Sequence, residues 1–457
     1  MSRRCPVETP ILNHVLVQLQ AALERDDLIG AANIIEALRP PDQAELFAEL
    51  DEEDQVALLP QLDPASSADI LEELYDEEAA ELVSALSTDD AIRIVDEMEP
   101  DEAADLLGDL EPEQAQAVLA GLDDPDEIHP LLLHPDDSAG GLMTSEFLAL
   151  RRRMSAAEAL QAIHEWQPDK ETSYYLYVVD RDRHLCGVVN MRQLIVAPPT
   201  AILAEIMEVE VISVPAGADQ EECARLMARY DLETLPVVDE HNVLLGVITI
   251  DDVIDVLEEE ATEDIQRLGG TEPLEGSYLN TGVLTITRKR IWWLLLLFVT
   301  ESLTGTVLRH FENELQSAVA LAFFVPLLIG TGGNAGSQTT STVIRALAVG
   351  DLTLRDAGWA MWHELRAGIL LGLCMGVVAY LRALTWGTGQ AMALTVSIAI
   401  FAIVIWANTL GSLLPLLAAK LNIDPTVVSG PAMSTLVDAT GLFIYFTIAG
   451  LILGIGN

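Results

Sequence analysis

The sequence predicts a multidomain protein: an all-α superhelical domain built like a solenoid, a tandem α/β pair, and an all-α transmembrane domain of five helices. Three observations lead to this fold class. Apolar residues recur every twelve positions in the first part, two similar segments with β-rich runs follow, and five long apolar stretches fill the last part. At 457 residues, the chain is long enough for several domains.

Charge is distributed unevenly along the chain. The net charge is −48, yet residues 288–457 carry 9 basic and 8 acidic side chains, so the excess lies before residue 288. Such a field disfavours nucleic acid as a partner and favours bound cations. The alternative is acidic solubility or a salt-adapted host.

The four cysteines show no CxxC spacing, and we expect neither a disulfide framework nor a zinc site. The N-terminus lacks the apolar core of a signal peptide, so we expect the acidic part to be cytosolic.

The first part contains a twelve-residue repeat from about Ala31 to Leu122. Apolar residues at positions i, i+1 and i+4 of each repeat lie on one helix face, so the repeat predicts short helices that stack as a solenoid. Pairs such as Asp63-Pro64 place an acid before a proline suited to the first helical turn. Asp101 and Asp105 share a helix face and repel each other unless a cation lies between them. The last apolar position of each repeat is Leu38, Leu50, Leu62, Leu74, Leu86, Met98, Leu110 or Leu122.

Two similar segments, residues 141–199 and 204–263, predict the α/β pair. Each has an amphipathic helix, a β-rich run that ends in Asp, a turn, and a second strand that leads into a helix. The pair resembles tandem CBS domains, which often bind adenine nucleotides through G-x-x-T-x-x-D. Gly246, Thr249 and Asp252 match this pattern in the second copy, whereas the first copy has Asn190 and Gln193. The resemblance therefore implies at most one nucleotide site, and a purely regulatory scaffold is the alternative.

Five apolar spans follow a dense acidic helix at 251–264 and a predicted connecting helix at 274–287. The spans are 291–309, 318–347, 369–385, 391–417 and 427–455, and most are long enough to cross a bilayer. Basic residues lie mainly at one set of span ends, which predicts a cytosolic N-terminus and an extracytoplasmic C-terminus.

Two features of the spans predict an ion path. The glycine-rich stretch 326–338 is poor material for a lipid-facing helix, and we expect it to break the second span and line a polar cavity. Asp438 lies within the last span, where a carboxylate costs about 3 kcal/mol and usually marks an ion path. Glu301 in the first span is a second such acid. Instead of belonging to the ion path, Glu301 could form hydrogen bonds with Thr300, Ser302 and Thr304 or lie near an interface.

The order of these parts, with P-x-x-x-G-T-G-G-N-x-G-x-Q and the late D-x-T-G at Asp438, resembles the MgtE family of magnesium channels and transporters. The resemblance covers nearly the whole chain. It implies a multi-pass protein of the cytoplasmic membrane that works as a homodimer and closes when cytosolic Mg²⁺ is plentiful. The implied domains are an acidic helical N domain at 1–136, CBS domains at 137–200 and 201–265, a connecting (plug) helix at 266–289 and a transmembrane domain at 290–457.

The resemblance also implies site residues. In the pore, Asp438 would hold hydrated Mg²⁺, helped by Gly330, Gly333 and Asn334, and ATP would bind, if at all, at the second CBS domain. Gly430 and Gln316 depart from the family pattern, which leaves the finer pore contacts open. The implied cytosolic Mg²⁺-sensor acids are Asp69, Asp101, Asp105, Glu221, Asp231, Asp252, Asp255, Glu260, Glu263, Asp264 and Asp424.

Two other functions fit the same features. One is transport of another divalent cation such as Co²⁺, because a hydrated-ion site discriminates by size and dehydration. The other is a membrane-bound divalent-ion or nucleotide sensor that conducts nothing. We do not expect an enzyme, because the sequence has no P-loop, no HExxH and no Ser-His-Asp spacing.

Overall fold

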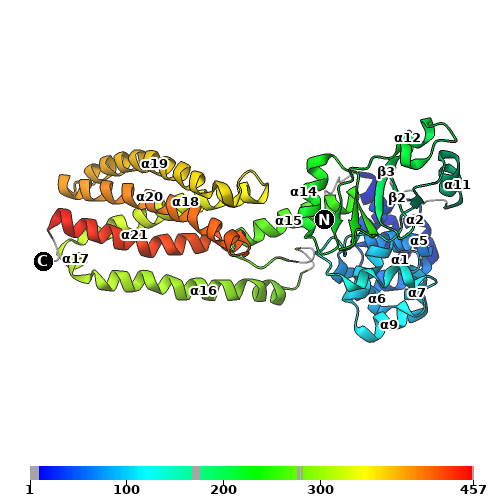
Figure 1. The fold of residues 1–457 in the computed structure, drawn as a ribbon. Coiled ribbons are helices and arrows are strands. Elements are labelled where there is room, and N and C mark those ends of the chain that lie inside the picture. The colour runs from blue at the N-terminus through cyan, green and yellow to red at the C-terminus, as the bar shows by residue number, and fades with distance from the viewer. Residues whose placement is uncertain (1–9, 167–174, 275–277, 279–280, 455–457) are drawn as a thin grey trace. The chain divides into compact units, whose positions relative to one another are not determined.

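The computed structural model describes residues 10–166, 175–274, 278 and 281–454, and its contacts divide the chain into two compact units (Figure 1). The first unit comprises the described residues up to Glu260, and the second begins at Ala261. Each unit is described by itself.

The first unit begins with the expected solenoid. From α2 to α9, the first residues of successive helices are 12 positions apart, as the repeat predicts. The last apolar residue of each repeat is buried or partly buried in the core. The helices are α1 (Pro10–Leu23), α2 (Leu28–Ile35), α3 (Pro40–Phe47), α4 (Glu52–Leu58), α5 (Pro64–Glu72), α6 (Asp76–Ala85), α7 (Thr88–Val95), α8 (Pro100–Asp109), α9 (Pro112–Leu119) and α10 (Pro125–Ile128).

Each helix packs against the helix two repeats away, so α2, α4, α6 and α8 form one stack and α3, α5, α7 and α9 form the other. The predicted prolines do stand in the first turns, but the acids before them make no side-chain cap bond in the described structure. Acids elsewhere in the repeat bond to backbone amides two repeats further along. The Glu36 and Glu72 carboxylates each accept an N–H at 2.8 Å, from Asp63 and Glu99, and Asp96 accepts one from Asp123 at 2.7 Å. Part of the acidic charge therefore ties the stacks together.

Among the described residues, the two copies of the α/β pair have the same topology. Each copy has a three-stranded sheet in which the first pair of strands is parallel and the second is antiparallel. The first copy contains β1 (Ala149–Arg151), α11 (Ala156–Trp166), β2 (Tyr175–Val179), β3 (Leu185–Asn190) and α12 (Met191–Val196). The second contains α13 (Leu203–Ile206), β4 (Val214–Pro215), α14 (Gln220–Tyr230), β5 (Thr234–Val238), β6 (Leu244–Thr249) and the start of α15 (Ile250–Leu268).

The stretch 274–287, expected to be a separate connecting helix, differs from the prediction in its described part. Helix α16 begins at Val283 and runs without a break into the first span, so residues 283–287 belong to that span's helix. Residues 275–277 and 279–280 of the predicted helix lie outside the described residues. In the described part of 266–289, α15 ends at Leu268, and Glu272 N–H bonds to the Lys289 carbonyl.

The second unit contains, among its described residues, five helices long and apolar enough to span a membrane. Helices α18, α20 and α21 pack against one another, α19 packs on α20, and α16 packs on α21. The helices of this unit beyond residue 282 are α16 (Val283–His310), α17 (Glu312–Ser317), α18 (Val325–Ala348), α19 (Ala357–Thr385), α20 (Gln390–Lys420) and α21 (Gly430–Leu453).

The expectation that the glycine-rich stretch breaks the second span is wrong. Residues 325–348 form one α-helix, α18, and the irregular part of the span is the preceding 3₁₀ segment Val319–Phe324. Gly332, Gly333 and Gly336 serve helix packing instead, because small residues let two backbones approach closely. A Cβ on Gly332 would lie 2.6 Å from Ile403 and 2.8 Å from Val437, and one on Gly333 would lie 2.9 Å from Ser434.

This packing predicts a sharp difference between two glycines of α18. Gly332→Ala should destabilise the protein by about 1–3 kcal/mol, because its Cβ overpacks the contact with α20 and α21. Gly330→Ala is the matched control, because a Cβ there meets nothing within 4 Å. Thermal unfolding of the purified protein in detergent measures both. Equal melting temperatures for the two variants would contradict the packing role.

Candidate functional site

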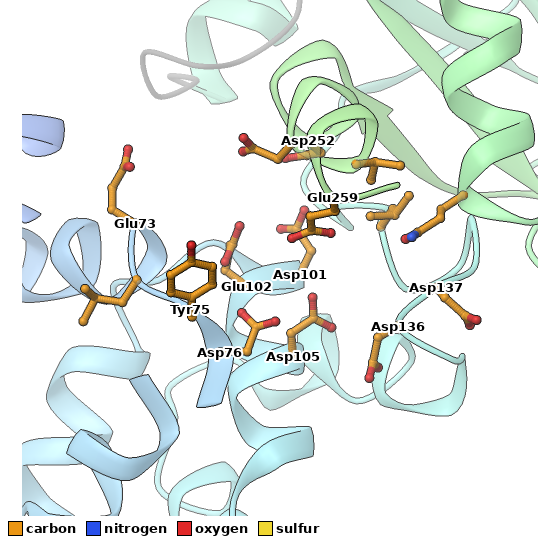
Figure 2. Close-up of a pocket in the computed structure, with 15 residues that line it drawn as sticks. Glu73, Tyr75, Asp76, Asp101, Glu102, Asp105, Asp136, Asp137, Asp252 and Glu259 are labelled. Atoms are coloured by element: carbon orange, nitrogen blue, oxygen red, sulfur yellow. The ribbon is translucent and has the colours of Figure 1, made fainter. Parts of the chain in front are cut away.

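An acidic cavity of about 300 Å³ lies in the first unit, between the solenoid, the loop that follows it and α15 (Figure 2). Helix α8 supplies Asp101 and Asp105, one turn apart, and α15 supplies Asp252, Asp255 and Glu259 on one face. The i, i+4 and i, i+3, i+7 spacings place these carboxylates side by side on their helices. None of the residues that line the cavity is basic; the remaining lining acids are Glu73, Asp76, Glu102, Asp136 and Asp137.

Burial and mutual repulsion raise the pKa values of the central carboxyl groups. Burial, followed by the nearby acids Asp76 and Asp136, raises the pKa of Asp105 to about 8. Burial also raises the pKa of Asp252 to about 6, despite a hydrogen bond from Thr249 that lowers it. For Asp101, burial and then the charge of Asp252 raise the pKa well above its ordinary value. Ionised carboxylates in the cavity are therefore energetically unfavourable unless a bound cation or protons neutralise them.

One oxygen of the cavity is left without a hydrogen-bond partner. Asp101 is only 6% exposed, and its Oδ1 is buried with no partner among the described residues. An unsatisfied buried carboxylate oxygen is costly and calls for an explanation. Carboxylates are the ligands that hard divalent cations such as Mg²⁺ prefer, so the donor set fits such an ion.

The cavity gathers four of the acids that the sequence singled out: Asp101, Asp105, Asp252 and Asp255. Glu260 is linked to its wall, because the Gln220 side chain donates a hydrogen bond to Glu260 at 2.8 Å. Asp69, Glu221 and Asp231 do not line it. Glu73, Asp76, Glu102, Asp136, Asp137 and Glu259 also line the cavity but were not predicted. The solenoid repeat placed Asp76 and Glu102 in helical first turns, but only the fold shows which turns face α15.

Glu221 and Glu263 have arginine partners one helical turn away. Arg225 pairs with Glu221 at 3.0 Å on α14, and Arg267 pairs with Glu263 on α15. The Arg267 guanidinium also donates a hydrogen bond to Asp424 at 2.7 Å, just before α21. A built-in cation therefore already neutralises part of this second group of predicted acids.

The nucleotide motif has structural roles in this fold. A Cβ on Gly246 would lie 2.6 Å from the Met143 side chain, so packing alone requires glycine there. The Thr249 hydroxyl donates to Asp252 at 2.5 Å, at the start of α15. In the first copy, Asn190 and Gln193 form a capping box on α12. The motif residues are thus in place, but their geometry does not by itself require a ligand.

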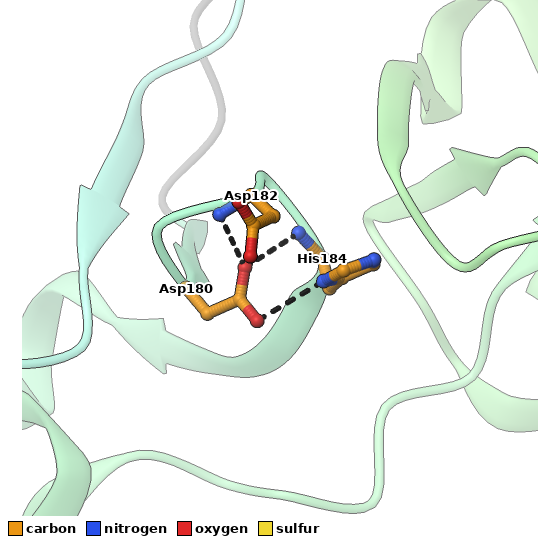
Figure 3. Close-up of side chains that lie close together, drawn as sticks. All are labelled: Asp180, Asp182 and His184. Atoms are coloured by element: carbon orange, nitrogen blue, oxygen red, sulfur yellow. Dashed lines mark hydrogen bonds and ion pairs between the residues drawn. The ribbon is translucent and has the colours of Figure 1, made fainter.

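A small cluster in the first copy, formed by Asp180, Asp182 and His184, has the spacing of a metal site (Figure 3). Asp180 accepts the backbone N–H groups of Asp182 and His184, and its other oxygen bonds His184 Nδ1 at 3.0 Å. Asp239 caps the matching turn of the second copy in the same way, through the N–H groups of His241 and Val243. Turn capping accounts for the cluster without an ion.

In the second unit, Asp438 lies half-buried on α21, next to Val437 at the close contact with α18. Gly330 and Asn334 lie on the exposed face of α18, whereas Gly333 is buried against Ser434. The predicted pore residues of α18 therefore fall into two groups. Gly330 and Asn334 are exposed, whereas Gly333 packs against α21. The Trp406 indole N–H donates to Thr440, two residues beyond Asp438, at 2.9 Å.

Comparisons with known proteins agree with this architecture. A family model described as a divalent cation transporter matches residues 325–448, one for the MgtE intracellular N domain matches 38–137, and the CBS domain model matches 139–199 and 203–259. The chain is 44% identical over 327 residues to the magnesium transporter MgtE of Thermus thermophilus, which is 72% of each chain. It is 35% identical over 325 residues to that of Enterococcus faecalis, 71% of each chain.

A solved structure is also similar. It is the cytosolic domain of the Mg²⁺ channel MgtE in complex with ATP, with 40% identity and a TM-score of 0.50. The match covers 53% of this chain and 99% of that one. The three-part fold class predicted from the sequence is confirmed.

The raised pKa values predict how stability depends on pH when divalent ions are chelated. The folded state holds the Asp105 proton up to about pH 8, whereas the ordinary Asp pKa is 3.8. Stability is therefore fully present below about pH 4 for this group and is lost as pH rises through about 8. Protection factors for hydrogen–deuterium exchange at α6 and α8 in chelator, corrected for the intrinsic exchange rate at each pH, should fall over this range. Asp105→Asn should flatten the dependence, and the exposed control Glu97→Gln should not. Increasing protection with pH would contradict it.

Proposed function

The chain belongs to the MgtE family of magnesium transporters, and we propose that it conducts Mg²⁺ across the cytoplasmic membrane as a homodimer gated by cytosolic Mg²⁺. Transport, not enzymatic catalysis, is the activity of this family. The five apolar helices supply the spans. Homodimer formation, the membrane orientation and the gating are parts of the proposal.

The proposal for permeation rests on Asp438. It is an acid on a span that contains neither Lys nor Arg in residues 431–454. A single carboxylate suits a permeating Mg²⁺ ion, which keeps most of its waters and binds through one or two carboxylates. The exposed Gly330 and Asn334 would add backbone and amide oxygens on α18, while Gly333 holds α18 against α21.

The proposal for gating rests on one observation, the buried Asp101 carboxylate with an unpartnered oxygen in a cavity lined by acids and no base. A divalent cation held between Asp101 and Asp105 of the solenoid and Asp252 and Asp255 of α15 would remove their repulsion and join the two elements. Without the ion, the carboxyl groups either repel one another or take up protons, and the ion no longer joins the two elements. Such an element has two states, and the bound ion selects one of them.

Helix α15 would carry this change onward. It is one helix from Ile250 to Leu268, so the cavity acids on α15 and Arg267 belong to the same helix. Arg267 donates a hydrogen bond to Asp424, which lies six residues before the first residue of α21, the helix that carries Asp438. We propose that Glu260, Glu263, Asp264 and Asp424 act along this route, and that Asp69, Glu221 and Asp231 bind ions outside the cavity.

The proposal extends to ATP at the second CBS copy. A relative's cytosolic domain was solved with ATP, and Gly246, Thr249 and Asp252 stand at the motif positions. Asn190 and Gln193 of the first copy are engaged in a capping box, which supports one site in each chain. Asp252 also lines the acidic cavity, so bound nucleotide would influence the ion site directly.

A flux assay in proteoliposomes tests the gating. Mg²⁺ flux through the full chain should fall as Mg²⁺ on the cytosolic side rises, whereas a truncated chain that begins near Leu274 should stay open. Asp101→Asn should raise the half-closing Mg²⁺ concentration by about tenfold or more, because it removes a ligand at the buried site. Glu97→Gln is the control, because Glu97 is exposed and does not line the cavity. Equal Mg²⁺ sensitivity in the full and truncated chains would remove the gating proposal.

A further inference from the structure

We propose that Trp406 is a positioning residue of the ion path, because its hydrogen bond to Thr440 fixes the rotation of α21 and with it the place of the Asp438 carboxylate. The indole N–H of Trp406, on α20, donates to the Thr440 hydroxyl at 2.9 Å. The inference rests on the proposed transport function and deepens it, because it adds a residue of a second helix to the geometry of the Asp438 site.

Helical geometry places Asp438 and Thr440 at opposite edges of the packed face of α21. At about 100° per residue, the two side chains point about 160° apart, and Val437 lies between them on the helix circumference. Val437 is buried, and a Cβ on Gly332 of α18 would lie 2.8 Å from it. The close contact with α18 therefore runs along the middle of this face, with Asp438 on one side and Thr440 on the other.

A contact of this kind restrains the rotation of α21 only weakly. Apolar packing is not directional, so a helix that packs along one line can roll about that line. Such a roll would move the half-buried Asp438 carboxylate relative to the rest of the bundle. A hydrogen bond is directional, and one that acts on Thr440 at the opposite edge resists the roll.

The bond also acts close to Asp438 along the helix. Ser337 donates to the carbonyl of the first residue of α21 at 3.1 Å, eight residues before Asp438. The Tyr445 hydroxyl, seven residues after Asp438, donates at 3.1 Å to a carbonyl of the 3₁₀ segment that precedes α18. These bonds hold α21 further from the acid, whereas the Trp406 bond acts two residues from it.

The Thr440 hydroxyl connects Trp406 to the backbone of α21. It donates to the Leu436 carbonyl, one turn earlier, at 2.8 Å, so its lone pairs remain to accept the indole N–H. The Thr440 side chain is therefore held at both ends, and hydrogen bonds in series strengthen one another. The pull of Trp406 is transmitted to the helix backbone and not to a mobile side chain.

Tryptophan is an unusual residue for this depth. Thr440 stands ten residues beyond the first residue of α21, which is about 15 Å along the helix and near the middle of a hydrocarbon layer about 30 Å thick. Tryptophan is enriched at the membrane–water interface, and its N–H needs a partner where water is absent. A phenylalanine would supply an apolar ring without this requirement, so apolar bulk alone does not explain Trp406.

Mg²⁺ flux through the full chain in proteoliposomes, at low cytosolic Mg²⁺, tests the inference. Trp406→Phe removes the N–H donor, and Thr440→Val removes the acceptor with little change of shape. Each should raise the half-saturating Mg²⁺ concentration by about three- to tenfold, as the loss of one hydrogen bond implies, while maximal flux stays within about twofold of wild type. The double variant should be no worse than either single one, because both remove the same bond. Thr440→Ser keeps the hydroxyl and should restore wild-type half-saturation.

Two other residues of α21 supply matched controls. Thr447→Val removes an exposed hydroxyl that donates to the Phe443 carbonyl of its own helix at 2.7 Å. Tyr445→Phe removes a hydrogen bond to another segment away from Asp438. Both variants should keep the wild-type half-saturating Mg²⁺ concentration, and Tyr445→Phe should lower the melting temperature in detergent.

The outcomes separate this inference from the transport proposal. If the wild type conducts and Asp438→Asn abolishes flux, but Trp406→Phe and Thr440→Val keep wild-type half-saturation, the positioning role is overturned and transport stands. A lower melting temperature with unchanged half-saturation, or failure of both variants to elute as monodisperse protein, also overturns it, because the bond then serves stability alone. Additive effects in the double variant overturn it as well. A wild type without Mg²⁺ flux contradicts the transport function itself.

Discussion

Repulsion between acidic side chains, in a cavity whose described lining contains no basic residue, is the physical constraint on which this account depends. In the first unit, it is concentrated in the cavity between α8 and α15, where burial raises the pKa values of Asp101, Asp105 and Asp252. In the second unit, Asp438 is an acid on a span that carries neither Lys nor Arg in residues 431–454. Acids arranged in this way favour the binding of cations, which supply the positive charge that basic residues do not. In the proposed function, ion sensing and ion permeation would both follow from this chemistry.

The rest of the fold holds these acids in place. The solenoid repeats every 12 residues, so successive helices present equivalent faces, and acids such as Glu72 bond across two repeats to fix the stacks. The small residues of α18 bring its backbone close to α21, and Gly332 has no room for a side chain. Where a fixed positive charge is present, as with Arg267 beside Glu263 and Asp424, the repulsion is already relieved. The proposed ion-dependent element is therefore the cavity and not every acid on α15.

Much of this architecture could be predicted from the sequence, because the relevant signals are periodic. The spacing of Leu38, Leu50 and Leu62 predicts the solenoid helices, and the apolar spans predict the membrane helices. The glycine-rich stretch was misread because glycines indicate either a broken helix or a close helix contact. Only the neighbouring Ile403 and Val437 decide between these, and they are far away in sequence. Cavity acids such as Asp136 were missed for the same reason, since they stand in a loop without a pattern.

Calorimetric titration of Mg²⁺ into the full-length protein, repeated in buffers of different ionisation enthalpy, tests the central claim most directly. Asp105, with a pKa of about 8, is mostly protonated at neutral pH, so an ion that binds in the cavity must displace its proton. The account predicts proton release on binding near pH 7 that declines as the pH rises well above 8 and is smaller in Asp105→Asn than in the wild type. Mg²⁺ binding with the same heat in every buffer at pH 7 would contradict it.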